Sequence, residues 1–196
     1  MRIIAGEFRG RKLLPPIGDA TRPITDRVKQ SLFDILTPHI EGAHVYDVFA
    51  GTGSMGLESV SRGAAHATFF EADRSAQNLL KQNIAALKVE SRSKIIPGDL
   101  FRWFAASPVP ATKANIIFLD PPYRFLTERS ADLKSLAENI SQKYLIPDGL
   151  VIFRHDHADK LDLPALRLID SRDYGSMRIE LLAKTQNEPQ INADER

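Results

Sequence analysis

An acidic residue, two prolines and an aromatic residue stand together in this chain, as Asp120, Pro121, Pro122 and Tyr123. They follow the apolar run 116–119, which predicts a buried strand. The prolines fix the backbone and donate no hydrogen bond, so the carbonyl groups of this loop can accept one. Acceptors beside a flat ring suit a planar group that carries an NH2, such as a nucleobase. A simple strand-ending turn is the alternative, because Pro and Asp are common turn residues.

A second chemical signal lies upstream, in a glycine loop. The pattern G-x-G-x-x-G is present at Gly51, Gly53 and Gly56. A predicted strand precedes this loop, a predicted helix follows it, and Glu71 ends the next predicted strand. This is the layout of a nucleotide-binding βαβ unit, in which the acid accepts hydrogen bonds from the ribose hydroxyls. A glycine-rich turn without a ligand is the alternative, but it leaves the agreement between strand, helix and acid unexplained.

The acids around the glycine loop indicate which nucleotide would bind. Asp47 ends the strand before the loop, where a carboxylate suits a cationic ammonium group better than a pyrophosphate. S-adenosylmethionine carries such an ammonium group and a sulfonium. Asp99 follows a third short strand and could accept a hydrogen bond from the adenine amino group. Capping of the next helix is the other role open to Asp99.

The elements that must position these residues alternate along the chain. We expect strands over 45–49, 67–70, 94–96, 116–119, 149–153, 166–169 and 177–183. Helices are predicted over 26–37, 55–62, 74–88 and 127–143, with a short one from about residue 99. Thr25 should cap the first helix and Pro38 should end it. The order predicts an α/β protein with a mostly parallel sheet, helices on both faces and an antiparallel C-terminal hairpin.

Length and composition indicate one globular domain with short extensions. The 196 residues contain 43% hydrophobic and 26% charged residues. We predict a basic N-terminal arm over 1–24, a catalytic domain over 25–184 and a disordered polar tail over 185–196. The absence of Cys excludes disulfides and thiolate metal sites. We find no secretory signal and no apolar run of membrane-spanning length, so a cytoplasmic protein is expected.

Basic residues are concentrated near the start of the chain. Residues 1–30 contain seven basic and three acidic side chains, although the net charge of the whole chain is +1. Such a segment suits a polyanion, and a solvated arm with scattered charges is the alternative. Our candidates for phosphate contacts with such a polyanion are Arg9, Arg11, Lys12, Arg22 and Arg27. We predict no metal site, because His155 and His157 lie in an expected loop and lack a third ligand.

Several stretches together resemble one known family. They are 2–6, 9–13, 21–28, 49–53, 120–123 and the pair Tyr174 and Gly175. Over about residues 1–183 the chain resembles the RsmD family, the S-adenosylmethionine-dependent guanine-N2 methyltransferases of small-subunit ribosomal RNA. The resemblance implies a Rossmann-like class I methyltransferase fold with seven strands, in a bacterial enzyme. One position departs from the family, which often has an acid after the fifth strand where this chain has Arg154.

The resemblance and the motifs together assign roles. We expect Asp120 and the Pro121 carbonyl to orient the guanine NH2, with Pro122 shaping the loop and Tyr123 stacking on the base. The expected cofactor contacts are Asp47, Phe49, Ala50, Gly51, Thr52, Gly53, Glu71, Ala72, Asp99, Leu100 and Asp120. The expected substrate is ribosomal RNA within a partly or fully assembled small subunit, and the expected enzyme is a monomer.

Three other functions compete with this interpretation. The same loop could serve an amino methyltransferase that acts on DNA adenine-N6 or on a protein glutamine. A nicotinamide-dependent oxidoreductase would use the glycine loop but would leave the Asp120 loop without a purpose. A non-catalytic RNA-binding assembly factor would leave both motifs without a purpose.

Overall fold

The computed structural model describes residues 1–16 and 24–185, and its centre is a twisted sheet of seven strands. The strands are β1 (His44–Val48), β2 (His66–Glu71), β3 (Ser93–Pro97), β4 (Ala114–Leu119), β5 (Leu145–Asp156), β6 (Leu166–Tyr174) and β7 (Met177–Lys184). Their order across the sheet is β3-β2-β1-β4-β5-β7-β6. Strands β1 to β5 pair in parallel, and β7 pairs antiparallel with both β5 and β6. This confirms the predicted fold class.

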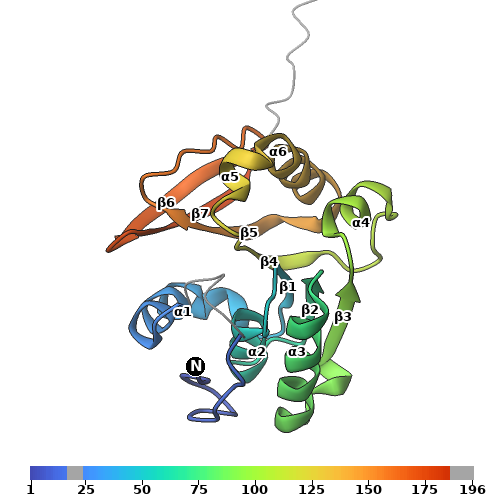
Figure 1. Cartoon of the computed structure of the whole chain (residues 1–196), viewed down its shortest axis with the longest axis vertical. Coiled ribbons are helices and arrows are strands. Elements are labelled where there is room, and N and C mark those ends of the chain that lie inside the picture. Colours follow the sequence, from blue (N-terminus) through green and yellow to red (C-terminus); the bar gives the residue numbers. More distant parts are fainter. Residues whose placement is uncertain (17–23, 186–196) are drawn as a thin grey trace, which may run out of the picture.

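Helices cover both faces of the sheet (Figure 1). One layer contains α1 (Asp26–Ile40), α2 (Ser54–Ser61) and α3 (Arg74–Leu87), and the other contains α4 (Leu100–Ala106), α5 (Phe125–Glu128) and α6 (Ser130–Asn139). A 3₁₀ turn, Glu90–Arg92, precedes β3, and a π-helical turn, Ile140–Tyr144, leads from α6 into β5. The molecule is therefore a three-layer α/β/α sandwich.

Side chains of the central strands alternate between the two faces of the sheet and contribute to hydrophobic clusters on both. Tyr46 and Val48 of β1 pack in the cluster beneath α4, α5 and α6. Val45 of the same strand joins the cluster beneath α1. Successive side chains of a strand point to opposite faces, so a strand covered on both sides is apolar almost throughout. Asp47 is the polar exception on β1, with only 2% of its surface exposed.

The register of the sheet brings the predicted functional loops to one edge. Val48 of β1 pairs with Leu119 of β4, and Leu119 pairs with Phe153 of β5. The residues that follow these pairs are therefore neighbours at the carboxyl ends of three parallel strands. Asp120 and Arg154 become adjacent in this way, although 33 residues separate them in the chain.

Two helical predictions are wrong in their boundaries. Pro38 does not end the first helix, which continues to Ile40. A proline in the last turn removes one hydrogen bond near the helix end, and burial of Ile40, which is 1% exposed, favours continuation. The helix predicted over 127–143 is divided at Arg129, whose φ of −130° is not helical.

Other local predictions are confirmed. Thr25 Oγ1 accepts a hydrogen bond from the Val28 amide at 3.3 Å and caps α1. Asp99 caps α4 through the amides of Phe101 and Arg102.

The fifth strand is longer than predicted. It spans Leu145–Asp156 and therefore includes His155. The expectation that His155 lies in a loop is wrong.

The N-terminal segment, residues 1–16, is held against α1 and α2 by a buried carboxylate. Its only strand-like pairing within residues 1–16 is an antiparallel bridge between Arg2 and Lys12, so the predicted hairpin is minimal. Glu58 of α2 is fully buried and accepts hydrogen bonds from the Ile4 and Ala5 amides at 2.8 and 3.0 Å. Lys29 Nζ lies 3.1 Å from Glu58 and donates to the Arg2 carbonyl at 2.7 Å.

Burial lowers the pKa of Lys29, and the Glu58 carboxylate opposes that effect. Arg62 Nε adds a second cation at 2.8 Å from Glu58. Removal of one member from such a buried cluster leaves an uncompensated charge, so the cluster holds the arm in one position.

The division into an arm over 1–24, a domain over 25–184 and a tail over 185–196 stays a prediction. Residues 17–23 and 186–196 lie outside the described residues. In the described part of the chain, no helix is long and apolar enough to cross a membrane.

Gly6 and Gly10 of the arm offer a matched pair of substitutions. Both have positive φ, at +82° and +83°, but a Cβ on Gly6 would lie 1.8 Å from the Ser61 carbonyl oxygen, whereas one on Gly10 meets nothing within 4 Å. We expect Gly10→Ala to lower the free energy of unfolding by about 1 kcal/mol, the cost of the left-handed conformation. Gly6→Ala should cost about 3 kcal/mol or more, because the arm must also leave its site.

Urea unfolding of both variants measures the difference. Equal losses of stability would contradict the tight docking of the arm on α2.

Candidate active site

Two adjoining cavities open at the carboxyl ends of the parallel strands. The larger has a volume of about 770 Å³, within the range of ligand pockets, and Glu71, Asp99, Phe101 and Phe125 are among its lining residues. The smaller is lined by residues that include Asp47, Tyr123 and Arg154. Both are bordered by Pro16, Phe49, Gly51, Asp120 and Pro122. Asp120 therefore lies where the two cavities meet.

The glycine loop borders both cavities through Gly51. The Gly51 amide donates to Glu71 Oε2 at 2.7 Å, which ties the loop to the end of β2. Gly53, another expected cofactor contact, lines neither cavity. A Cβ on Gly53 would lie 2.4 Å from Leu80 Cδ1, and one on Gly56 would lie 2.3 Å from Phe69 Cε1. The first glycine thus borders the ligand space, and the other two allow α2 to pack closely.

Phe49 has an uncommon backbone conformation for a large side chain, with φ of +66°. Its ring packs edge-on against Phe101 and Phe125, with centroid distances of 5.8 and 6.0 Å. Strained residues of this kind cost of the order of 1–3 kcal/mol and persist where surrounding contacts hold them. The conformation turns the chain from β1 into the glycine loop, so we interpret it as part of the site.

The larger cavity combines aromatic walls with acidic acceptors. Phe101 and Phe125 supply aromatic surfaces, and the Arg129 guanidinium lies 4.0 Å from the Phe101 centroid. Glu71 lies at one side of this space and accepts hydrogen bonds from the Gly51 and Asp73 amides at 2.7 Å each. Asp99, Ala72 and Leu100, three of the expected cofactor contacts, also line the cavity. Acidic acceptors and flat apolar walls are what a ribose and an adenine require.

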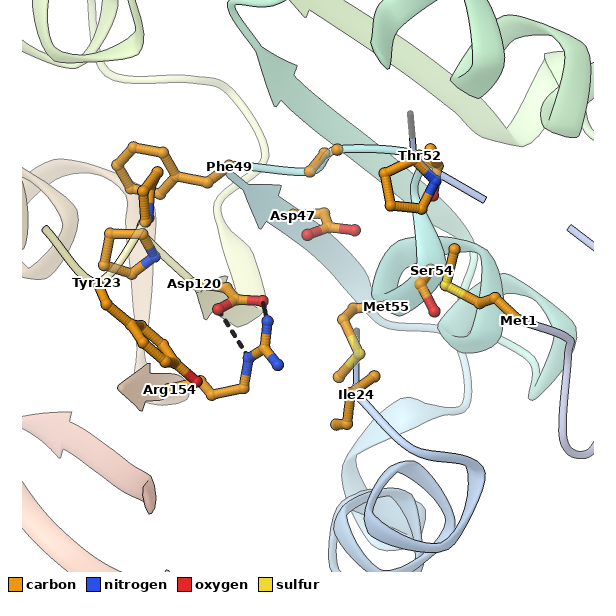
Figure 2. A pocket seen from close by; sticks show the side chains of 15 residues that line it. Met1, Ile24, Asp47, Phe49, Thr52, Ser54, Met55, Asp120, Tyr123 and Arg154 are labelled. Carbon is orange, nitrogen blue, oxygen red and sulfur yellow. Dashed lines mark hydrogen bonds and ion pairs between the residues drawn. The ribbon is translucent and has the colours of Figure 1, made fainter. Parts of the chain in front are cut away.

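Asp47 gives the smaller cavity a buried carboxylate (Figure 2). Its Oδ2 accepts a hydrogen bond from the Gly56 amide at 2.8 Å. Burial raises the pKa of Asp47 to about 8, with the Gly56 hydrogen bond opposing the shift. A cationic group bound here would favour the ionised carboxylate, and the ammonium of S-adenosylmethionine is such a cation. Ala50 and Thr52 line the same cavity.

The predicted catalytic loop crosses the opening between the two cavities. The Asp120 amide donates to the Val48 carbonyl at 3.4 Å, which extends the β1–β4 pairing by one residue. The Pro122 carbonyl accepts from the Phe125 amide at 2.8 Å, and the Tyr123 carbonyl accepts from Leu126 at 3.0 Å. The carbonyl of Pro122 is thus used at the start of α5, which favours the Pro121 carbonyl as the acceptor for a substrate.

Arg154 was not among the predicted site residues, yet it contacts the central one. Its Nε lies 2.7 Å from Asp120 Oδ1 and its Nη2 lies 2.5 Å from Asp120 Oδ2 (Figure 2). Burial alone would lower the pKa of Arg154, but the Asp120 carboxylate raises it above its ordinary value. Arg154 therefore lies in direct contact with the predicted catalytic loop.

The candidate RNA contacts within the described residues line neither of these two cavities. Arg9, Arg11, Lys12 and Arg27 are exposed, and Arg11 Nη2 donates to the Ala86 carbonyl at 2.7 Å. Arg22 lies outside the described residues. The described arm brings Pro16 to both cavities, so the basic segment approaches the site along its backbone.

Sequence reasoning missed several lining residues besides Arg154. Phe101, Phe125 and Arg129 form walls of the larger cavity, and Ile24 and Met55 line the smaller one. They belong to loops and helix starts, where no periodic pattern marks them. Phe101 and Phe125 each follow a predicted site residue by two positions, which was the one signal available.

His155 has a structural position. It is 3% exposed, its ring lies 4.7 Å from that of Phe153, and its Nδ1 contacts the Asp156 carbonyl oxygen at 2.7 Å. Among residues 1–16 and 24–185, no three His, Cys, Asp or Glu side chains form a group that could hold a metal ion.

Comparison with known proteins identifies the family. Residues 1–183 match the family model described as Conserved hypothetical protein 95. Ribosomal RNA small subunit methyltransferase D of Haemophilus influenzae is 40% identical over 152 residues, which are 77% of this chain and 76% of that protein. The chain belongs to the RsmD family. The prediction made from the motifs is confirmed.

Other members of the family and related folds agree. The Escherichia coli protein of the same name is 43% identical over 124 residues, 63% of this chain and 61% of that protein. A solved Escherichia coli structure described as a candidate methyltransferase, YhhF, superposes with a TM-score of 0.79 at 32% identity, covering 94% of this chain and 97% of that one. Membership of the RsmD family, an enzyme family of ribosomal RNA methyltransferases, decides against the oxidoreductase and the non-catalytic assembly factor.

The raised pKa of Asp47 leads to a pH-dependent prediction. The folded protein holds this proton more tightly than the unfolded chain, in which the ordinary pKa is 3.8, so stability falls as the pH rises from about 4 to about 8. Asp47→Asn removes the titration and keeps an oxygen acceptor for the Gly56 amide. We expect the stability advantage of the variant over the wild type to grow by about 2 kcal/mol between pH 6 and pH 8.

Urea unfolding of the ligand-free protein at the two pH values measures this advantage. Asp162→Asn, at an exposed position outside both cavities, serves as the control. An advantage that does not change with pH would contradict the assignment.

Proposed function

We propose that this protein transfers a methyl group from S-adenosylmethionine to the exocyclic N2 amine of a guanine in small-subunit ribosomal RNA. The observation that carries the proposal is the position of Asp120, at the junction of a nucleoside-sized cavity and a second cavity bordered by Tyr123. A methyl donor that extends from the first cavity to Asp47 in the second, and a base that enters the second cavity beside Tyr123, would meet at this carboxylate. Membership of the RsmD family supports the same reaction and substrate.

Residues of both cavities are proposed to bind and orient the cofactor. Glu71 accepts hydrogen bonds from the ribose hydroxyls, and Asp99 accepts one from the adenine amino group. Asp47 receives the ammonium group at the end of β1. When bound, S-adenosylmethionine supplies an electrophilic methyl group that needs no further activation, so positioning provides much of the rate.

The loop over 120–123 is proposed to prepare the nucleophile. The lone pair of a guanine N2 amine is delocalised into the ring, which makes the amine a poor nucleophile. Asp120 and the Pro121 carbonyl accept hydrogen bonds from the NH2, which directs its lone pair towards the methyl group. Tyr123 stacks on the base and fixes its plane. The base must leave its stack to reach this loop.

The basic arm is proposed to bind the RNA around the target base. Arg9, Arg11, Lys12 and Arg27 supply exposed positive charge, and we extend the proposal to Arg22 of the same basic segment. A pocket for one base offers little surface, so phosphate contacts supply most of the affinity. We further propose that the enzyme acts as a monomer on RNA within a partly or fully assembled small subunit. Equal methylation of naked RNA and assembled particles would count against that last point.

Methyl transfer to isolated ribosomal subunits tests the proposed function. Small subunits from a strain that lacks this gene are incubated with the purified protein and labelled S-adenosylmethionine, and the RNA is digested to nucleosides. We expect label in N2-methylguanosine. Bound cofactor without label in that nucleoside would redirect the assignment to an amino methyltransferase for DNA or protein.

The role of Asp120 is tested by Asp120→Ala. We expect methyl transfer to fall at least 100-fold while the Kd for the neutral ligand S-adenosylhomocysteine changes little, because the lost group acts on the acceptor. The variant leaves Arg154 without its carboxylate, so thermal unfolding must accompany the assay. A variant that keeps the turnover of the wild type would refute this role.

A further inference from the structure

Arg154 is built into the site by the sheet itself. It follows Phe153, which pairs with Leu119, so parallel pairing of β4 and β5 holds its Cα beside that of Asp120. The side chains of Arg154 and Asp120 are 13% and 21% exposed. A two-point contact between partly buried groups at the end of two paired strands has little freedom to rearrange.

The geometry of the contact restricts the carboxylate of Asp120. The guanidinium is planar, and its Nε and Nη2 each donate to a different carboxylate oxygen. Such a fork fixes the plane of the carboxylate as well as its position. It uses one acceptor position on each oxygen, and an ionised carboxylate offers about four positions. The carboxylate can therefore still accept hydrogen bonds from a substrate amine, in a direction that the fork determines.

The same contact sets the charge at the junction of the cavities. Arg154 and Asp120 both line the smaller cavity, and together they contribute no net charge there. Without Arg154, the Asp120 carboxylate would present an uncompensated negative charge to whatever occupies both cavities.

We propose that Arg154 is a positioning residue for methyl transfer, which holds the Asp120 carboxylate in one plane and compensates its charge where the two cavities meet. The proposal rests on the proposed function. Arg154 acts through Asp120, whereas Asp120 contacts the reacting amine.

Two variants separate the plane from the charge. Arg154→Lys keeps a cation but loses the fork, and we expect it to lower kcat for small subunits about 10-fold. Arg154→Met loses both, and we expect kcat to fall about 100-fold with a smaller change in KM, because alignment of the amine is affected more than binding of the RNA.

Arg178→Met is the matched control. Arg178 forks Asp173 with the same two nitrogens, at 2.7 and 2.9 Å, in an exposed pair on the β6–β7 hairpin that lines neither cavity. We expect it to change kcat by less than about twofold, as is usual for exposed ion pairs.

A double-mutant cycle shows whether Arg154 acts through Asp120. In an Asp120→Asn background, Arg154→Met should change kcat by less than about threefold, because the carboxylate that it positions is already lost. Full additivity of the two effects would overturn the proposal, and so would Arg154→Met at the rate of the wild type.

The relative affinity for a cationic and a neutral ligand distinguishes loss of charge compensation from loss of packing. S-adenosylmethionine carries a sulfonium cation, whereas the sulfur of its demethylated product, S-adenosylhomocysteine, is neutral. In Arg154→Met the uncompensated Asp120 charge should raise the preference for the cation over the neutral ligand by about fivefold. Calorimetric Kd values for the two ligands, with wild type, Arg154→Met and Arg154→Lys, measure this preference, and Arg154→Lys should keep that of the wild type.

The two ligands also separate this proposal from the proposed function. A wild-type protein that binds both ligands but labels no guanine would refute the proposed function, and the affinity ratio would still decide the role of Arg154. An unchanged ratio in Arg154→Met would overturn charge compensation. If Arg154→Met does not fold, the kcat of Arg154→Lys and its cycle with Asp120→Asn decide the positioning role.

Discussion

The parallel pairing of β1 with β4 is the constraint on which the rest of the site depends. The strand order reverses at this pair, because the chain passes from β1 to β2 and β3 on one side and returns to β4 on the other. The loops that follow β1 and β4 therefore diverge, and open α/β sheets bind their ligands in the crevice this creates. The glycine loop and the loop over 120–123 are those two segments, so the crevice between them is a consequence of topology.

Charge is the second organising feature, because the fold buries carboxylates and balances each one differently. Glu58 is surrounded by Lys29, Arg62 and two backbone amides of the arm. Asp47 has an amide partner, and its proton supplies the remaining compensation. Asp120 has a guanidinium at both oxygens. The first arrangement is complete and structural, whereas the other two carboxylates border a cavity that a ligand can enter.

Much of this was predictable from the sequence, and the exceptions have physical reasons. Strand and helix periodicity, the glycine pattern and the loop at Asp120 predicted the sheet, its hairpin and both halves of the site. Pro38 does not end α1 as predicted, because burial of Ile40 favours one more helical turn. Arg154 escaped notice as a site residue because its role depends on strand register, which a single sequence does not reveal. Phe101 and Phe125 converge from the starts of two helices, α4 and α5, and no local sequence pattern indicates such convergence.

The anchoring of the arm has a consequence for how this enzyme could be re-engineered. The amides of Ile4 and Ala5 are partners of a carboxylate that belongs to α2, the helix that the glycine loop begins. An arm transplanted from another protein would bring different side chains but would have to present the same two amides to Glu58. An exchanged arm whose backbone follows a different path would leave the buried Glu58 carboxylate without these two hydrogen-bond donors. The arm, α2 and Lys29 should therefore be exchanged together when chimaeras are built between relatives.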